Sequence, residues 1–283
     1  MFLSIEEIDR LIKEDVPYID LTSWLLGINE QLGSISYFSR EEAVVCGTEE
    51  VKMIFDRLSI GTVQFISSGE LVKPGDVLIS GAGQGCSLNT AWKVGQNILE
   101  HCSGIATKTL SMVRIVKNIN PNIAVLTTRK GFPGTKPLAV KAVMAGGAVP
   151  HRLGLSETVL IFKQHINYIG GFDALLGKMP ELKTKSCGKR VVVECSLYEE
   201  AKRLCKAGVD GIQFDKVPAA IVKNIVARLK EDYPTVTFFA AGGINETNAA
   251  EYADTNIDGI VTTSLYSAKP VDIGVDIKTD SCN

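Results

Sequence analysis

From about Val116 onward, short apolar runs alternate with longer segments of helical periodicity. The apolar runs are rich in β-branched residues and cover 123–128, 158–163, 190–195, 211–214, 236–240 and 257–262. Strands that are apolar at nearly every position are typical of a parallel sheet buried on both faces. The pattern therefore predicts six parallel strands, and a seventh if 148–152 adds one, in a closed or nearly closed α/β barrel.

The segments between these runs carry the signals of helix ends. Ser196 and Glu199 have the spacing of a capping box, and Gly208 stands where that helix is expected to stop. Pro137 favours the first turn of another helix. Asn245, after Gly242 and Gly243, is a candidate N-cap for a further helix.

The first hundred residues have a different pattern. Thr48 is expected to cap a helix whose apolar residues recur at i, i+3, i+4 and i+7 from Val51. Residues 62–85 resemble turns that join short strands. A long helical stretch over 87–118, interrupted around Ser103 and Gly104, would lead into the barrel. We therefore expect an α+β module followed by a barrel domain.

Composition excludes several classes of function. The 283 residues carry a formal net charge of -2, so the chain lacks the broad basic surface that nucleic acid requires. No run approaches the roughly 20 apolar residues of a membrane span, and the first residues fit no signal or transit peptide. The cysteines are odd in number and form no CxxC pair, which predicts reduced thiols in a cytoplasmic protein without a zinc site; they are residues 46, 86, 102, 187, 195, 205 and 282.

Polar residues follow the predicted strands, and in a parallel barrel the carboxyl ends of the strands form the site. The basic members suit a polyanion, whereas the two acids suit a sugar or a developing cation, so a phosphorylated sugar fits both. The glycine pair could bring backbone N–H groups to a phosphate. These candidates are Arg129, Lys130, His151, Arg152, Lys163, His165, Glu194, Asp215, Gly242 and Gly243.

Structural alternatives exist for the same residues. His151 and Arg152 could pair with a neighbouring acid, and Glu194 could pair with a lysine of the barrel. The glycine pair could be a simple turn. His165 is expected to have a structural role.

Several motifs occur in a fixed order along the chain. They are SGIATKT (103–109), TTRKGFPGTKPLAVKAVMAGGAVPHRLGL (127–155), VVVEC (191–195), IQFDK (212–216), AAGGIN (240–245) and DIGVD (272–276). In this order they resemble the quinolinate phosphoribosyltransferase family, also called nicotinate-nucleotide pyrophosphorylases. Residues 89–109 are most similar to its ModD branch, assigned as pyrophosphorylases and associated with molybdate-transport genes. The resemblance runs from about residue 14 to Asp276.

The resemblance implies a fold and a reaction. The fold is an N-terminal α/β sandwich over 1–104, joined by the tail 268–283, and an incomplete seven-stranded α/β barrel over 105–267. The family works as a homodimer whose sites use residues from both subunits. In its reaction an aromatic ring nitrogen attacks the anomeric carbon of phosphoribosyl pyrophosphate, pyrophosphate leaves with Mg²⁺, and the quinolinate adduct loses carbon dioxide.

The resemblance also implies roles by position. Arg129, His151 and Arg152 would bind a carboxylate of the nucleophile, and Lys130 would neutralise pyrophosphate. The two acids would face the ribose and the magnesium-bound pyrophosphate, and the glycine pair with the next strand's loop would hold the 5-phosphate; these residues are Glu194, Asp215, Gly242, Gly243, Thr263 and Ser264.

The departures from the family lie on the nucleophile side. Phe162 occupies the place of a family lysine, and Lys163 that of the following aspartate. Lys93 stands where a partner-subunit arginine clasps quinolinate, and Gly131 and Lys136 are further changes. Because each lost charge-assisted hydrogen bond costs roughly 1.5–3 kcal/mol, we expect an acceptor other than quinolinate, with Phe162 as an apolar wall or stacking face.

Two other hypotheses are compatible with the sequence. The chain could be a non-catalytic module that binds a small oxyanion such as molybdate in the same anion pocket. Lys163 could also form a Schiff base on a barrel strand, as in aldolase-type enzymes.

Overall fold

The computed structural model describes residues 3–280 and divides into two compact units. Unit 1 comprises Met1–Leu110, Phe132–Gly147 and Tyr266–Asn283, and unit 2 comprises Ser111–Gly131 and Ala148–Leu265. Cys282 and the end of the predicted tail 268–283 lie outside the described residues. The cysteines within them are unpaired, as expected, at positions 46, 86, 102, 187, 195 and 205.

Unit 1 is built on a four-stranded antiparallel sheet, with the order β13-β1-β5-β3. Its strands are β1 (Leu32–Ser39), β3 (Gly61–Phe65), β5 (Val77–Gln84) and β13 (Ile273–Thr279). A short ladder joins β2 (Ala43–Val44) to β4 (Leu71–Val72). Residues of β1 alternate between buried and less buried, as a sheet with one covered face requires.

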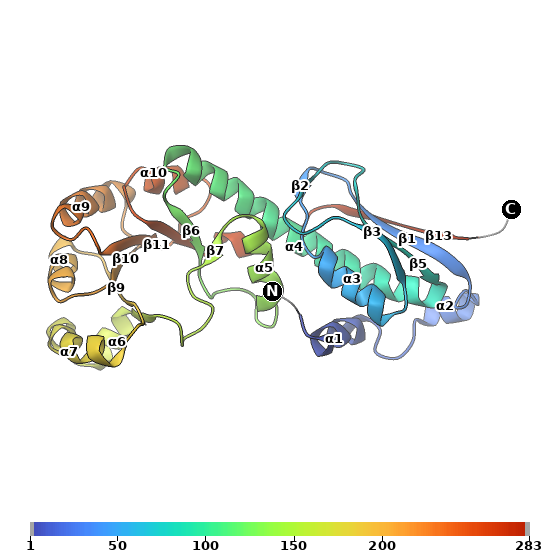
Figure 1. The fold of residues 1–283 in the computed structure, drawn as a ribbon, viewed down its shortest axis with the longest axis horizontal. Helices are drawn as coiled ribbons and strands as arrows, with labels where there is room; N and C mark the ends of the chain where they lie inside the picture. The colour runs from blue at the N-terminus through green and yellow to red at the C-terminus, as the bar shows by residue number, and fades with distance from the viewer. Residues whose placement is uncertain (1–2, 281–283) are drawn as a thin grey trace. The chain divides into compact units, whose positions relative to one another are not determined.

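Five helices belong wholly or partly to unit 1 (Figure 1): α1 (Ile5–Asp15), α2 (Leu21–Leu26), α3 (Thr48–Arg57), α4 (Gly85–Ile119) and α5 (Lys136–Ala145). The helices α3 and α4 share one apolar core with the sheet, in which Ile54, Leu99 and Ile35 are fully buried. Thr48 is the first residue of α3 and Gly47 its N-cap, so the expected threonine cap is wrong by one residue. Pro137 lies in the first turn of α5, as predicted.

Helix α4 is continuous, so the expected interruption at Ser103 and Gly104 is wrong. Ser103 and Gly104 allow other segments of the chain to pack closely against the helix, and they do not interrupt it. A Cβ at Gly104 would overlap the carbonyl group of Lys269, and the Ser103 hydroxyl accepts a hydrogen bond from the Cys46 N–H at 3.0 Å. Small side chains let neighbouring backbone pack directly against the helix.

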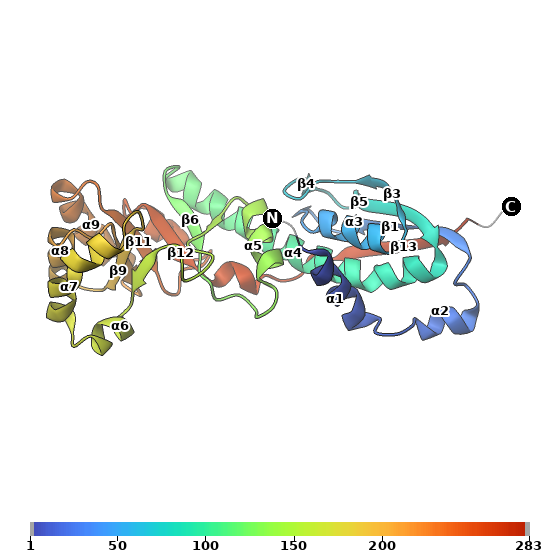
Figure 2. The same cartoon turned by 60° about the horizontal axis from the view of Figure 1, so that its bottom comes forward.

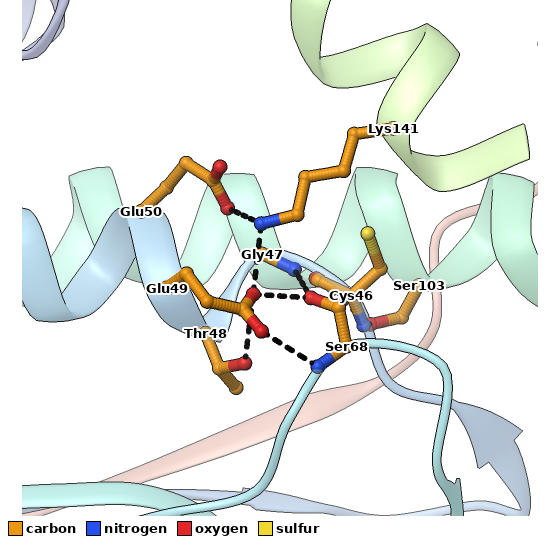
Figure 3. Close-up of polar contacts among 8 residues, drawn as sticks. All are labelled: Cys46, Gly47, Thr48, Glu49, Glu50, Ser68, Ser103 and Lys141. Carbon is orange, nitrogen blue, oxygen red and sulfur yellow. Dashed lines mark hydrogen bonds and ion pairs between the residues drawn. The ribbon is translucent and has the colours of Figure 1, made fainter. Parts of the chain in front are cut away.

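A partly buried ion-pair cluster connects α5 to α3 (Figure 3). Lys141 Nζ lies 2.8 Å from Glu49 Oε2 and is also bonded to Glu50, whose side chain is 3% exposed. The Ser68 amide donates to Glu49 Oε1 at 2.9 Å. Burial would raise the pKa of Glu49, but hydrogen bonds from Lys141 and Ser68 outweigh it and hold the pKa at about 2.

Unit 2 contains a sheet of seven parallel strands with the order β7-β6-β12-β11-β10-β9-β8. The strands are β6 (Ala124–Thr127), β7 (Val149–Pro150), β8 (Val159–Ile161), β9 (Val191–Cys195), β10 (Gly211–Asp215), β11 (Thr237–Ala241) and β12 (Gly259–Thr262). No ladder joins β7 to β8 among the described residues. The prediction of an incomplete seven-stranded α/β barrel is confirmed.

The remaining helices follow the strands along the chain. They are α6 (Lys163–Tyr168), α7 (Phe172–Lys185), α8 (Tyr198–Lys206), α9 (Ala219–Asp232), α10 (Ala249–Ala253) and the 3₁₀ helix η1 (Ser264–Ser267). In Figures 1 and 2, α8 and α9 lie on the outer side of β9, β10 and β11. None of the helices described has the length and apolar character that a membrane crossing needs.

Two predicted caps in unit 2 are displaced. Helix α8 has Leu197 as its N-cap without a side-chain hydrogen bond, so the capping box expected at Ser196 does not form. Gly208, with φ +87°, does follow the end of α8 as predicted. The N-cap of α10 is Asn248 and not Asn245, because a turn headed by Asn245 precedes the helix.

Strand alternation decides which side chains enter the barrel. On β11, Phe238 stacks on Phe214 of β10 at a ring separation of 6.3 Å, on the opposite face of the sheet from Phe239. Phe239 packs with Leu126, Ala241 and Val261 in a small interior cluster. By the same alternation, Gln213 and Asp215 share the interior face of β10 with Glu194 of β9, which is Gln213's register partner.

Candidate active site

A hollow of about 430 Å³ lies where the parallel strands of unit 2 end. Its lining includes nearly all of the predicted site residues of the barrel. They are Arg129, Lys130, His151, Arg152, Phe162, Glu194, Asp215, Gly242, Gly243, Thr263 and Ser264.

The cations enter this hollow from adjacent strands. Arg129 and Lys130 follow β6, and His151 and Arg152 follow β7, its ladder partner. Arg152 is 8% exposed, and its Nη1 donates to the Thr158 carbonyl oxygen at 3.3 Å. Burial, and then the charge of Arg129, lower the pKa of Arg152. Two guanidinium groups that line one hollow and repel each other are suited to an anion that lies between them.

His151 is the neutral member of the basic group. Its ring meets Phe239 edge-on at 5.1 Å between centroids. Burial, followed by the charge of Arg152, lowers the pKa of His151 below its ordinary value. Near pH 7 this imidazole therefore offers one donor and one acceptor and no charge.

The acids lie on neighbouring strands, Glu194 on β9 and Asp215 at the end of β10. Burial, and then the charge of Asp215, raise the pKa of Glu194. A hydrogen bond from Gln213 Nε2, 3.4 Å from Glu194 Oε2, opposes this rise, together with the charges of Lys130 and Lys216. The structure therefore keeps a half-buried carboxylate among cations, where it can face a positive charge that develops on a ligand.

The glycine pair forms a tight loop after β11. Gly242 and Gly243 have φ of +86° and +77°. Neither amide has a backbone hydrogen-bond partner in the described part of the chain. Asn248 Nδ2 donates to the Gly243 carbonyl oxygen at 3.2 Å, and Thr262 Oγ1 donates to the Ile244 carbonyl oxygen at 2.6 Å. The loop is thus held through its carbonyl groups, while its N–H groups stay available to an anion.

We expect Gly242→Ala to weaken phosphate binding in this hollow by at least about 10-fold. A Cβ there would lie 2.5 Å from Lys216 Cγ and 2.7 Å from Asp215 Oδ1, at a φ that side chains rarely adopt. Calorimetric titration with ribose 5-phosphate measures the loss. Gly188→Ala is the matched control, because Gly188 also has a positive φ but no atom lies within 4 Å of its added Cβ. Equal affinities of the two variants would contradict the role of the loop.

Phe162 lies at the end of β8, outside the strand, as the N-cap of α6. Its ring stacks on His165 at 5.8 Å, and the Arg152 guanidinium carbon lies 5.9 Å from the ring centroid. His165 Nδ1 accepts a hydrogen bond from the Phe162 N–H at 2.9 Å, consistent with the structural role expected of it. A second hollow of about 500 Å³ adjoins here and shares Arg129, Arg152, Leu160 and Phe162 with the first.

Besides His165, which lines only the second hollow, two predicted residues do not line the first. Lys163 is exposed as the first residue of α6, because the strand ends at Ile161, so it is no barrel-strand lysine suited to a Schiff base. Lys93 belongs to α4 in unit 1, where its Nζ donates to Gln96 Oε1 at 3.0 Å and lies 4.6 Å from the Trp92 ring centroid.

Gln213 and Lys216 are among the lining residues that sequence reasoning missed. Gln213 is 5% exposed, and its Oε1 has no hydrogen-bond partner among the described residues. An amide between two apolar residues of a strand was the available signal, since a buried polar side chain usually has a partner. Lys216 directly follows the strand that ends in Asp215, as the other predicted site residues follow theirs.

The described residues contain no cluster of three or more His, Cys, Asp or Glu side chains that could hold a metal ion. Glu194 and Asp215 are a pair of carboxylates. Such a pair suits a magnesium ion that takes most of its ligands from water and substrate phosphates.

Comparison with known families gives two matches that together cover most of the chain. The N-terminal domain of quinolinate phosphoribosyl transferase matches residues 20–103, and the C-terminal domain matches residues 105–276. The chain belongs to the quinolinate phosphoribosyltransferase family. It is therefore an enzyme of the pentosyltransferase class.

Individual members of this family are similar over nearly their whole length. A protein named ModD and assigned as a pyrophosphorylase, from Pasteurella multocida, is 34% identical over 98% of this chain and 99% of its own. The ModD of Rhodobacter capsulatus is 38% identical over 85% of this chain and 92% of its own. Among solved structures, the nicotinate-nucleotide pyrophosphorylase of Ehrlichia chaffeensis is 26% identical, with a TM-score of 0.89 over 98% of this chain and 100% of its own.

Proposed function

We propose that this quinolinate phosphoribosyltransferase-family protein transfers the phosphoribosyl group of phosphoribosyl pyrophosphate to a ring nitrogen of an aromatic acceptor. The supporting observation is that four elements share one hollow: the arginine pair, Lys130, the two acids and the glycine loop. A bare anion-binding module has no use for two carboxylates that repel an anion. By contrast, two carboxylates would stabilise a sugar that gains positive charge as its pyrophosphate departs.

The acids act on the sugar in this proposal. When pyrophosphate leaves, the anomeric carbon and the ring oxygen of the ribose carry positive charge. Ionised Glu194 and Asp215 stabilise that charge more than they stabilise the neutral sugar, which lowers the barrier. The cations near Glu194 favour its ionised form against the effect of burial.

The leaving group and the 5-phosphate lie on the cationic and glycine-rich sides. Lys130 neutralises the pyrophosphate, and the Gly242–Gly243 loop with Thr263 and Ser264 binds the 5-phosphate. We propose Mg²⁺ as the cofactor, which the pyrophosphate would hold near Glu194 and Asp215. When bound, it neutralises charge that develops on the leaving oxygen.

The acceptor binds beside Phe162 in this proposal. Arg129 and Arg152 hold one carboxylate of the acceptor, and Phe162 offers its ring face where a cation would bind a second carboxylate. Relatives such as the protein of Methanothermobacter thermautotrophicus, 28% identical, are assigned as carboxylating nicotinate-nucleotide pyrophosphorylases. We propose that this chain prefers an aromatic acceptor with fewer carboxylates than quinolinate.

We further propose a cytoplasmic homodimer in which Lys93 of one subunit reaches the acceptor bound by the other. A ModD-like role in molybdenum utilisation is the corresponding proposal for its physiology, supported by the similarity to ModD proteins.

The decisive experiment follows pyrophosphate release. The protein is incubated with phosphoribosyl pyrophosphate, Mg²⁺ and a panel of pyridine and purine-like acceptors with none, one or two carboxylates. Release that depends on both the acceptor and Mg²⁺ supports the transferase. Tight calorimetric binding of molybdate without turnover of any acceptor would favour the oxyanion-binding module instead.

We expect Phe162→Lys to raise kcat/KM for quinolinate by about 10-fold or more, since one charge-assisted hydrogen bond contributes roughly 1.5–3 kcal/mol. The same change should lower kcat/KM for the preferred acceptor, because the ring face is lost. Phe162→Leu is the control, because it removes the ring without adding a charge. Equal kcat/KM values for quinolinate in the wild-type protein and both variants would contradict the proposed role of Phe162 in the acceptor site.

A further inference from the structure

Lys216 has an unusual backbone conformation within the hollow. Its φ is +56°, in the left-handed region that residues other than glycine and asparagine seldom adopt. The conformation is held by a hydrogen bond from the Lys216 N–H to the Ala241 carbonyl oxygen, at 2.8 Å. Strained residues of this kind persist where the surrounding structure requires them, often at binding sites.

This conformation places the lysine stem against the glycine loop. A Cβ built on Gly242 would lie 2.5 Å from Lys216 Cγ and 2.7 Å from the backbone nitrogen of Lys216. The methylene groups of the lysine therefore occupy the space that any side chain at Gly242 would need. Gly242 is a glycine partly because Lys216 lies over it.

The charge of Lys216 is available to a ligand. Its side chain forms no ion pair within residues 3–280. It acts on Glu194 through space, where it lowers the pKa of that carboxyl against burial. The residue is exposed and lines the hollow.

The strand order puts Lys216 beside the glycine loop and away from the other cations. Lys216 follows β10, the glycine pair follows β11, and Thr263 and Ser264 follow β12. Arg129 and Lys130 follow β6, on the far side of β12. An anion on the glycine loop is thus flanked by hydroxyl groups on one side and by Lys216 on the other.

We propose that Lys216 is the cation of the 5-phosphate subsite, where it neutralises the phosphate monoester bound by the Gly242–Gly243 loop. Backbone N–H groups carry only partial charges, so a dianionic phosphate gains from one formal positive charge beside them. The proposal rests on the proposed function, which places a phosphorylated sugar in this hollow. It separates the two cationic regions: Lys216 serves the 5-phosphate, and Lys130 serves the leaving pyrophosphate.

The test uses Lys216→Met, which keeps the stem over Gly242 and removes the charge. Calorimetric titration with ribose 5-phosphate should show a roughly 10- to 100-fold weaker Kd than for the wild-type protein. Inorganic pyrophosphate, titrated with Mg²⁺, should bind within about 3-fold of wild type. Lys206→Met is the matched control, because Lys206 is an exposed lysine of α8 outside the hollow and should bind both ligands as wild type does.

A second variant separates charge from backbone strain. Lys216→Asn adopts the left-handed region more readily, so its melting temperature should be at least that of wild type. Its affinity for ribose 5-phosphate should nevertheless fall as in Lys216→Met. Unchanged affinity in both variants, or a loss confined to pyrophosphate, would overturn the assignment of Lys216. Failure of the wild-type protein to bind ribose 5-phosphate and phosphoribosyl pyrophosphate would instead contradict the proposed function.

Discussion

Glu194→Gln is expected to lower kcat for pyrophosphate release by about 10²- to 10³-fold, with the Kd for phosphoribosyl pyrophosphate changed less than about 10-fold. The amide keeps the shape of the side chain, but it cannot stabilise a positive charge on the ribose as a carboxylate does. Steady-state kinetics and calorimetry measure the two quantities. Glu199→Gln, at an exposed position of α8, is the control and should leave both unchanged. A large loss of binding with little loss of kcat would contradict a role in the transition state.

The pH profile provides an independent measure of the same group. Because burial and then Asp215 raise the pKa of Glu194, activity should rise with pH through that raised value as the carboxylate forms. Asp215→Asn removes one cause of the rise, so the acidic limb of its residual activity should move to lower pH. Gln213→Leu removes the hydrogen bond that favours the carboxylate, so its limb should move to higher pH. If the acidic limb of the pH profile does not move in either variant, it reports the titration of a group other than Glu194.

Lys141→Met is expected to lower the free energy of unfolding of unit 1 by about 3–5 kcal/mol. The change leaves Glu50, 3% exposed, without its charge partner, and Glu49 loses its bond as well. Urea unfolding followed by tryptophan fluorescence measures the loss, because both tryptophans, Trp24 and Trp92, lie in unit 1.

The control for this change is Lys52→Met, which breaks an exposed pair with Asp56 and should cost no more than about 1 kcal/mol. The wild-type protein should also lose stability as pH falls from the ordinary glutamate range toward 2, because the depressed pKa of Glu49 is about 2. The Lys141→Met variant should lose less stability than the wild-type protein over that pH range. Equal costs for the two lysine variants would show that the cluster contributes no more than a surface pair.

The repeating order of strands and helices in unit 2 could be predicted from the sequence because each strand is apolar at nearly every position. Helix interruptions and caps were less predictable. Gly104 resembles a break in the linear pattern, yet the close approach of Lys269 explains it without one. Ser196 has capping-box spacing, but the helix begins after Leu197. Both errors arise because tertiary packing outweighs local preference.

The site could be predicted from one simple rule: side chains that follow parallel strands meet at one edge of the sheet. This rule brought together residues as distant in sequence as Arg129 and Ser264. It misplaced Lys163, because strand β8 ends two residues earlier than the apolar run suggests. Lys216 satisfied the rule, and what singles it out, a left-handed backbone against Gly242, appears only in three dimensions.

The missing ladder between β7 and β8 affects how easily related proteins can evolve different acceptor preferences. These two strands have two and three residues, and the segments after them carry His151, Arg152 and Phe162. Insertions between these two strands interrupt no ladder between them, whereas β10, β11 and β12 are each paired on both sides. Exchange of residues 151–158 between relatives leaves the β8–β9 ladder intact. Together with substitution at Phe162, it should therefore be an efficient route to new nucleophiles on an unaltered sugar-binding half.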